Sequence, residues 1–196
     1  MAEESIAPLL AEIRACRRCA ADLPHGTRPV LQAAGSARLL LVGQAPGRRV
    51  HQSGTPYDDA SGARLRRWLG LADRDFYDPA LVAIQPMGFC YPGRGKSGDL
   101  PPRPQCAPLW HGRLAAALPR IELTVLIGWH AMRFYLGRHR QGTLTETVRA
   151  WRDYGPRFFP VPHPSARNTA WFQHHPWFEA QVVPALAARV AALLLP

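Results

Sequence analysis

The chain has 196 residues, of which 47% are apolar and 19% are charged. These proportions exclude a disordered chain and predict one globular domain over residues 1–196 with a sizeable core. No apolar run approaches the roughly 20 residues of a membrane-spanning helix, and we find no secretory signal. We therefore expect a soluble protein of the cytoplasm that has no membrane partner.

Positive charge dominates the sequence. Lys and Arg number 24 against 14 acidic residues, which gives a net charge of +10, and Lys96 is the only lysine. Such an excess favours a polyanionic partner, because each neutralised phosphate releases condensed counterions. A coding bias towards arginine accounts for the missing lysines but not for the net charge. We therefore predict that the partner is nucleic acid.

Helical and strand patterns alternate along the chain. A run of four apolar residues in the first predicted strand is typical of a strand that is covered on both faces. Asp59 or Ser61 is the expected N-cap of the second helix. The predicted elements, in chain order, are a helix over residues 5–18, a strand over 38–43, a helix over 61–71, a strand over 81–84, a helix over 105–118, a strand over 123–127, helices over 130–136 and 145–154, a strand over 157–161 and a helix over 182–195.

This alternation predicts an α/β fold: a three-layer α/β/α sandwich around a central, mostly parallel four-stranded sheet. The distinctive turns follow strands, at residues 43–47, 85–88, 128–130 and 162–165. In open α/β sheets the ligand crevice lies outside the carboxyl ends of the strands. We therefore expect the four turns to surround one site.

Four cysteines form a candidate metal centre: Cys16, Cys19, Cys90 and Cys106. Four thiolates suit zinc or an iron–sulfur cluster. The first pair is closely spaced, whereas the second spans a loop rich in Gly and Pro, which favours a cluster over a zinc knuckle. The alternatives are four unrelated buried thiols or two disulfides, and a reducing cytosol argues against disulfides.

Two turns carry further motifs. Gly43 and Gly47 flank Pro46, so backbone can approach a ligand closely there. The turn lacks the Gly-Lys-Ser/Thr ending of a phosphate-binding loop. A later strand is followed by His163 and Ser165 on either side of a proline.

Together these segments resemble the uracil-DNA glycosylase superfamily, most closely its iron–sulfur class, over nearly the whole chain. The first motif of that superfamily corresponds to residues 43–47 and its last motif to residues 163–165. The resemblance implies that Tyr57 stacks on the substrate base and that the four cysteines hold a 4Fe–4S cluster, with zinc as the alternative. It also implies a wedge pressed into the duplex by the segment after the last motif.

The sequence departs from the family pattern at several positions. Gln44 stands where the iron–sulfur class usually has Glu, and Ala45 where the best-known members have a water-orienting Asp. Pro86 replaces an asparagine that reads uracil, and Asn168 is the only asparagine in the chain. Gln85 offers the same donors and acceptors as that missing asparagine.

The resemblance implies a monofunctional DNA repair glycosylase that hydrolyses the N-glycosidic bond of uracil, or of a related deaminated base, after base flipping. We expect His163 to donate to the departing base. Water is expected to be positioned by Gln44, His51, Asp58 or Asp59. The alternative for Asp58 and Asp59 is that they cap the following helix, and the alternative for His51 is that it only packs the loop. The expected substrate-binding residues are Gly43, Ala45, Pro46, Gly47, Tyr57, Gln85, Phe89 behind Tyr57, and Ser165.

The expected DNA contacts are Arg167, Asn168 and Trp171, with Arg94 and Lys96 in a basic loop that the cluster holds in shape. We expect a nucleoid-associated monomer. A non-catalytic DNA-binding or damage-sensing protein of the same fold is the main alternative. A zinc-stabilised hydrolase of nucleosides or small nucleotides is a weaker one, because small substrates need no broad basic face.

Overall fold

The computed structural model describes residues 6–194, and its centre is one four-stranded sheet. The strands are β1 (Leu39–Val42), β2 (Val82–Ile84), β5 (Leu123–Ile127) and β6 (Phe158–Val161). Their order is β2-β1-β5-β6, and all three pairings are parallel. The predicted α/β fold is confirmed.

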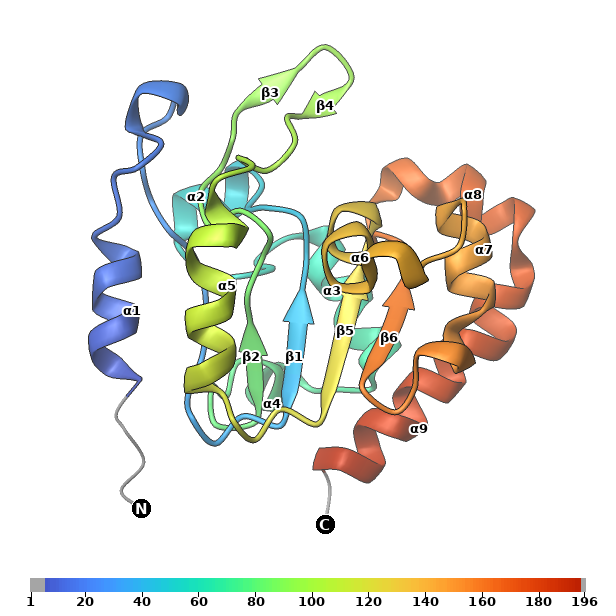
Figure 1. Cartoon of the computed structure of the whole chain (residues 1–196). Coiled ribbons are helices and arrows are strands. Elements are labelled where there is room, and N and C mark those ends of the chain that lie inside the picture. Colours follow the sequence, from blue (N-terminus) through green and yellow to red (C-terminus); the bar gives the residue numbers. More distant parts are fainter. Residues whose placement is uncertain (1–5, 195–196) are drawn as a thin grey trace.

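Helices and short turns connect the strands. They are α1 (Ala7–Arg14), α2 (Arg48–Ser53), α3 (Ala60–Leu69), α4 (Asp73–Phe76), α5 (Cys106–Ala117), α6 (Trp129–Leu136), α7 (Leu144–Arg149), α8 (Thr169–His174) and α9 (Val183–Leu194). A two-stranded hairpin, β3 (Arg94–Gly95) with β4 (Gly98–Asp99), lies between β2 and α5. In Figure 1 this hairpin projects beyond the carboxyl ends of the sheet strands.

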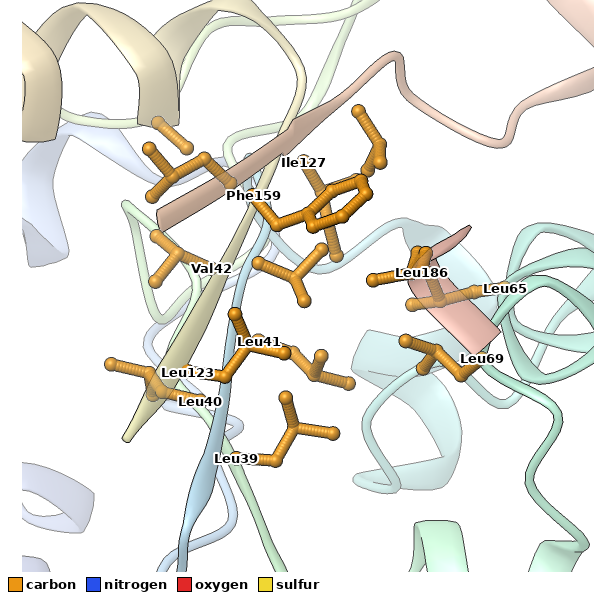
Figure 2. Close-up of a cluster of buried hydrophobic side chains, with 14 of the residues drawn as sticks. Leu39, Leu40, Leu41, Val42, Leu65, Leu69, Leu123, Ile127, Phe159 and Leu186 are labelled. Carbon is orange, nitrogen blue, oxygen red and sulfur yellow. The ribbon is translucent and has the colours of Figure 1, made fainter. Parts of the chain in front are cut away.

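The sheet lies between two layers of helices. Figure 1 shows α5 in front of the sheet and α3 behind it. Figure 2 shows Leu39 and Leu41 of β1 pointing towards Leu65 of α3 and Leu186 of α9, whereas the intervening Leu40 points to the other side. Both faces of β1 are therefore buried, which explains why its four residues are all apolar.

Several elements differ from the sequence-based prediction. Helix α1 ends at Arg14, before the first cysteine, and residue 5 lies outside the described residues. The predicted helix over 145–154 starts one residue earlier, after a capping box between Thr143 and Glu146, and passes into a 3-10 turn after Arg149. The C-terminal helix is preceded by a π-helical turn over Phe178–Val182, and residue 195 is not described.

The sequence-based prediction did not include the short helices α2, α4 and α8 or the β3–β4 hairpin. Each has two to six residues, which is too short for a periodic apolar pattern to be visible. Tertiary contacts rather than local pattern must therefore hold them.

The strand order defines where a ligand binds. The chain leaves β1 towards β2 on one side, and it leaves β5 towards β6 on the other. Neighbouring strands whose connections diverge open a crevice at their carboxyl ends. The strand order therefore predicts a site near the turns after β1 and β5.

No single helix within residues 6–194 is long and apolar enough to cross a membrane. One pair, Ala166–His174 with Phe178–Leu194, reaches that length and composition only across a bend of 92°.

Candidate active site

A cavity of about 390 Å³ opens at the carboxyl ends of the strands. It combines the first motif with the last one, and Pro86 comes from the turn after β2. No residue of the turn at 128–130 lines it, so the expectation that all four turns surround the site is wrong for that turn; a Cβ on Gly128 would instead lie 3.5 Å from the Cβ of His163. The lining residues of the cavity are Val30, Gly43, Gln44, Ala45, Pro46, Gly47, Val50, Pro56, Tyr57, Asp59, Ser61, Ile84, Pro86, Asp99, Leu100, His163, Ser165, Arg167 and Asn168. Most of the residues expected to bind substrate are therefore brought together.

Backbone hydrogen bonds fix the first motif to the turn after β2. The N–H of Met87 donates to the carbonyl of Gly43 at 2.9 Å, and that of Gly88 donates to the carbonyl of Gln44 at 3.0 Å. The side-chain Nε2 of Gln44 donates to the carbonyl of Leu100 at 3.4 Å. One wall of the cavity is thus rigid, and its amide side chain is tied to the hairpin segment.

Tyr57 lines the cavity, and its ring lies against Gly43. The Tyr57 hydroxyl occupies the space that a Cβ on Gly43 would need. The backbone of Tyr57 is left-handed, with φ 55°, which is unusual for a bulky residue and concentrates at functional sites. Its carbonyl accepts from Arg66 Nη1 and from the Tyr77 hydroxyl, each at 3.4 Å. Burial raises the pKa of the Tyr57 phenol well above its usual range, so the hydroxyl is neutral.

His163 follows β6 and is half-buried. The backbone N–H of Ser165 donates to its Nδ1 at 3.2 Å, so the ring proton of the neutral imidazole lies on Nε2. Burial lowers the pKa of His163 below the ordinary value of 6.5, while the charges of Asp59 and Asp99 act in the opposite direction. The site therefore presents a neutral imidazole that donates from Nε2.

Two carboxylates line the cavity. The Oδ1 atom of Asp59 accepts from the N–H of Gly62 at 2.8 Å and caps α3, as predicted. A Cβ on Gly47 would lie 3.6 Å from Asp99 Oδ2 and 4.0 Å from Asp59 Oδ2. Both carboxylates thus reach the same stretch of the cavity wall. Sequence reasoning missed Asp99, because no motif marks a residue carried in by a short hairpin.

The hairpin is connected to the last motif through Arg167. The Nη1 of Arg167 donates to the carbonyl of Ser97 at 3.3 Å, and its guanidinium occupies the space that a Cβ on Gly98 would need. The hydroxyl of Tyr91, next to Cys90, lies 3.5 Å from Asp99 Oδ1. The hairpin therefore joins the two sides of the cavity.

Two residues expected to bind the base do not line the cavity. Gln85 directly follows β2, between the lining residues Ile84 and Pro86, but its side chain is buried and does not line the cavity. Its Nε2 donates instead to the Tyr135 hydroxyl at 3.0 Å. Phe89 is buried in a separate apolar cluster with α1 and α5. The ring behind Tyr57 is that of Phe76, with the centroids 6.2 Å apart.

The structure also places two of the candidate water-positioning residues, Asp58 and His51, outside the cavity. Asp58 points towards Arg49, with Oδ1 and Nη2 separated by 3.7 Å. His51 lies in α2 against His25 and Tyr91, and burial lowers its pKa.

Trp171, expected in the DNA wedge, packs inward. Its indole N–H donates to Thr145 Oγ1 at 2.9 Å, and its ring stacks on that of His175. Asn168 and Arg167 do line the cavity, although the side-chain Nδ2 of Asn168 donates to the carbonyl of His163 at 2.7 Å. Arg94 and Lys96 are exposed on the hairpin.

The four cysteines line one small pocket, which shares no lining residue with the cavity. All four are free, so the disulfide alternative is wrong. Burial raises the pKa of Cys90 to about 11 and that of Cys106 to about 12. Within residues 6–194, no group of three or more His, Cys, Asp or Glu side chains converges closely enough to hold a metal ion.

A family model described as Uracil DNA glycosylase superfamily matches residues 31–187, which is most of the chain. The chain therefore belongs to the uracil DNA glycosylase superfamily, a class of DNA glycosylases. Cys16 and Cys19 precede the matched range, so the match concerns the superfamily and not its iron–sulfur class.

We predict that Gly43→Ala abolishes base excision without unfolding the protein. The added methyl would collide with the hydroxyl end of Tyr57, so that ring must shift and the cavity wall must change shape. The clash involves the far end of one side chain and no backbone atom, so the fold should persist. Excision is measured on a uracil-containing oligonucleotide and stability by thermal unfolding.

Gly112→Ala is the matched control, because a Cβ at this position of α5 meets nothing within 4 Å. It should keep full activity and gain up to about 1 kcal/mol in stability. Equal activity in the two variants would contradict the placement of Tyr57.

Proposed function

We propose that this protein hydrolyses the N-glycosidic bond of uracil, or of a related deaminated base, in DNA after the nucleotide has flipped into the cavity. The observation that carries the proposal is the neutral His163, held by the Ser165 N–H in the tautomer that donates from Nε2. Negative charge develops on the departing base, so a preoriented donor at its carbonyl oxygen lowers the barrier.

The carboxylates supply the other half of the reaction. The bond from C1′ to the base nitrogen breaks, the oxygen of water bonds to C1′, and the proton that water loses passes to the departed base or to solvent. Asp59 uses Oδ1 for its helix cap, and its Oδ2 faces the cavity. In our proposal this oxygen orients the water and stabilises the positive charge on the sugar, with Asp99 contributing from the hairpin.

Base recognition is proposed to use the aromatic ring of Tyr57 for stacking. The amide of Gln44 and the backbone near Gly43 supply polar groups for the base edge. These assignments replace Gln85 and Phe89, which lie elsewhere. The pocket offers no lysine for a covalent intermediate, because Lys96 does not line it. A monofunctional hydrolysis is therefore proposed.

The exposed cations beside the cavity support DNA as the substrate. They come from the segment after the first motif, the hairpin and the last motif: Arg48, Arg49, Arg94, Lys96 and Arg167. Such side chains bind phosphates without reading sequence. We propose that the protein binds DNA as a monomer.

The four thiols are proposed to hold a 4Fe–4S cluster. This proposal rests on the donor chemistry of four thiols and on their placement around one small pocket, and zinc stays the alternative. The N–H of Phe89, which donates to Cys106 Sγ at 3.4 Å, is a contact that also stabilises a thiolate.

We propose a structural role for this cluster. Cys90 and Cys106 bracket the segment that carries the hairpin and Asp99, while Cys16 and Cys19 follow α1. Joining them would fix the N-terminal segment and the hairpin segment to each other, and so hold the hairpin in place against DNA.

We expect the purified protein to release uracil from single- or double-stranded oligonucleotides, leaving alkali-labile abasic sites. His163→Ala should lower the rate about 10²-fold or more, the range found when one transition-state donor is removed. Strand cleavage after alkali treatment measures the product.

Asp59→Asn is the second variant in this assay. The amide oxygen can still accept from Gly62 and cap α3, so only the charge is removed. Retained folding with a large loss of rate would support the carboxylate role. Binding of DNA without any base release by the native protein would instead favour the damage-sensing alternative.

The excision rate should fall with decreasing pH below 6.5. The folded pKa of His163 lies below that ordinary value, so the neutral ring predominates at pH 6.5 and the protonated ring gains as the pH falls further. Protonation turns Nδ1 into a donor that opposes the Ser165 N–H. Single-turnover rates measured at several pH values test this. The control is His163→Gln, whose amide does not titrate, so its rate should not show this fall. A rate that rises as the pH falls would mean that the imidazolium is the active form.

For the cluster, protein purified without oxygen should contain iron and acid-labile sulfide, with about four of each per chain. Cys106→Ser should lose both and unfold at a lower temperature, while Thr27→Ser, which alters a thiol-free residue of the same pocket, should keep both. Bound zinc without sulfide would support the alternative. Metal-free protein whose stability is unchanged by Cys106→Ser would refute both.

A further inference from the structure

A nucleotide that leaves the helix stack opens a gap in the duplex, and proteins fill such gaps with apolar side chains. Within residues 6–194, three large hydrophobic side chains are strongly exposed: Leu100 at 43%, Leu109 at 42% and Phe134 at 45%. Of these, only Leu100 lines the cavity. An exposed leucine therefore stands where the cavity meets solvent.

The backbone of Leu100 is held at both ends. Its N–H donates to the carbonyl of Gly93 at 2.9 Å, and its carbonyl accepts from Gln44 Nε2 at 3.4 Å. Two prolines, Pro101 and Pro102, follow it and restrict the chain further. The side chain is thus presented from a fixed support rather than from a mobile loop.

The hairpin leaves room for this side chain. A Cβ on Gly95 would approach Leu100 Cδ2 at 3.0 Å, closer than real Cβ atoms normally come. Gly93 has φ 94°, a conformation that side chains rarely adopt. The missing side chain at Gly95 therefore leaves room for that of Leu100, whereas a Cβ on Gly93 would first meet Pro24.

Charge identifies what this leucine meets. Arg94 and Lys96 are exposed on the same hairpin, and Arg167 reaches it from the last motif through the Ser97 carbonyl. An exposed leucine on a segment that also carries exposed cations suits a duplex, because a duplex has phosphates on its outside and stacked bases inside. A protein partner would not require this concentration of positive charge.

The segment after the last motif is poorly suited to the wedge role that the sequence predicted for it. Trp171 is packed against Thr145 and His175. The side chains of Asn168 and Arg167 are already hydrogen-bonded to His163 and Ser97. The two aromatic side chains of that segment, Trp171 and Phe172, therefore both pack against other rings.

We propose that Leu100 is the wedge that enters the base stack and fills the gap left by the flipped nucleotide. This inference rests on the proposed function, since it assumes that a nucleotide enters the cavity. It moves the wedge from the last motif to the hairpin between the third and fourth cysteines.

Leu100→Ala tests the wedge against Leu109→Ala, an equally exposed leucine on α5 that does not line the cavity. The first measurement compares uracil release from duplex and single-stranded oligonucleotides. Leu100→Ala should lower kcat/KM on the duplex about tenfold or more while changing the single-stranded rate less than about twofold, because a single strand has no stack to fill. Leu100→Met should restore the duplex rate, and Leu109→Ala should change neither.

The second measurement needs no chemistry. Affinity is compared between a duplex with a stable abasic-site analogue and the same duplex intact. The native protein and Leu109→Ala should prefer the abasic duplex, and Leu100→Ala should lose most of that preference. A Leu100→Ala protein that keeps the preference, or that loses single- and double-stranded rates equally, would overturn the proposal. Absence of uracil release by native protein would refute the proposed function alone, since the affinity comparison still decides the role of Leu100.

Discussion

The cavity depends on the placement of the Tyr57 ring. The hydroxyl of Tyr57 occupies the space of a missing Cβ at Gly43, and its carbonyl occupies the space of a missing Cβ at Gly62. Its left-handed backbone is held by hydrogen bonds from Arg66 and Tyr77 to the Tyr57 carbonyl. Because this turn leads directly into the Asp59 cap of α3, the same constraint positions both an aromatic wall and a carboxylate.

The electrostatics of the site combine opposite charges at different depths. Asp59 and Asp99 line the cavity, while exposed arginines surround its opening. Both kinds of charge act on His163. Burial and Arg167 lower the pKa of its imidazole, and the two carboxylates raise it. Burial dominates, so the imidazole stays neutral. A positively charged exterior suited to DNA can thus coexist with an interior that, in the proposed reaction, stabilises positive charge on the sugar.

The segment from Cys90 to Cys106 connects features that lie far apart in the sequence. Cys90 faces the thiols that follow α1, and the neighbouring Tyr91 contacts Asp99. Leu100 follows in the cavity wall, tied to Gln44 of the first motif. Changes at the cysteine pocket are therefore expected to reach the reaction site and the DNA surface together.

The sequence by itself determined the sheet and the two motif turns, because strand burial and turn chemistry leave local patterns. The runs at residues 39–42 and 123–127 lie in buried strands, and Gly43 and His163 line one cavity as expected. Only the tertiary structure decided which neighbour faces the site: Asp59 and not Asp58, Pro86 and not Gln85. A shift of one residue reverses the direction of a side chain in a strand or turn, and Asp99 and Leu100 arrive through a hairpin too short to leave any pattern.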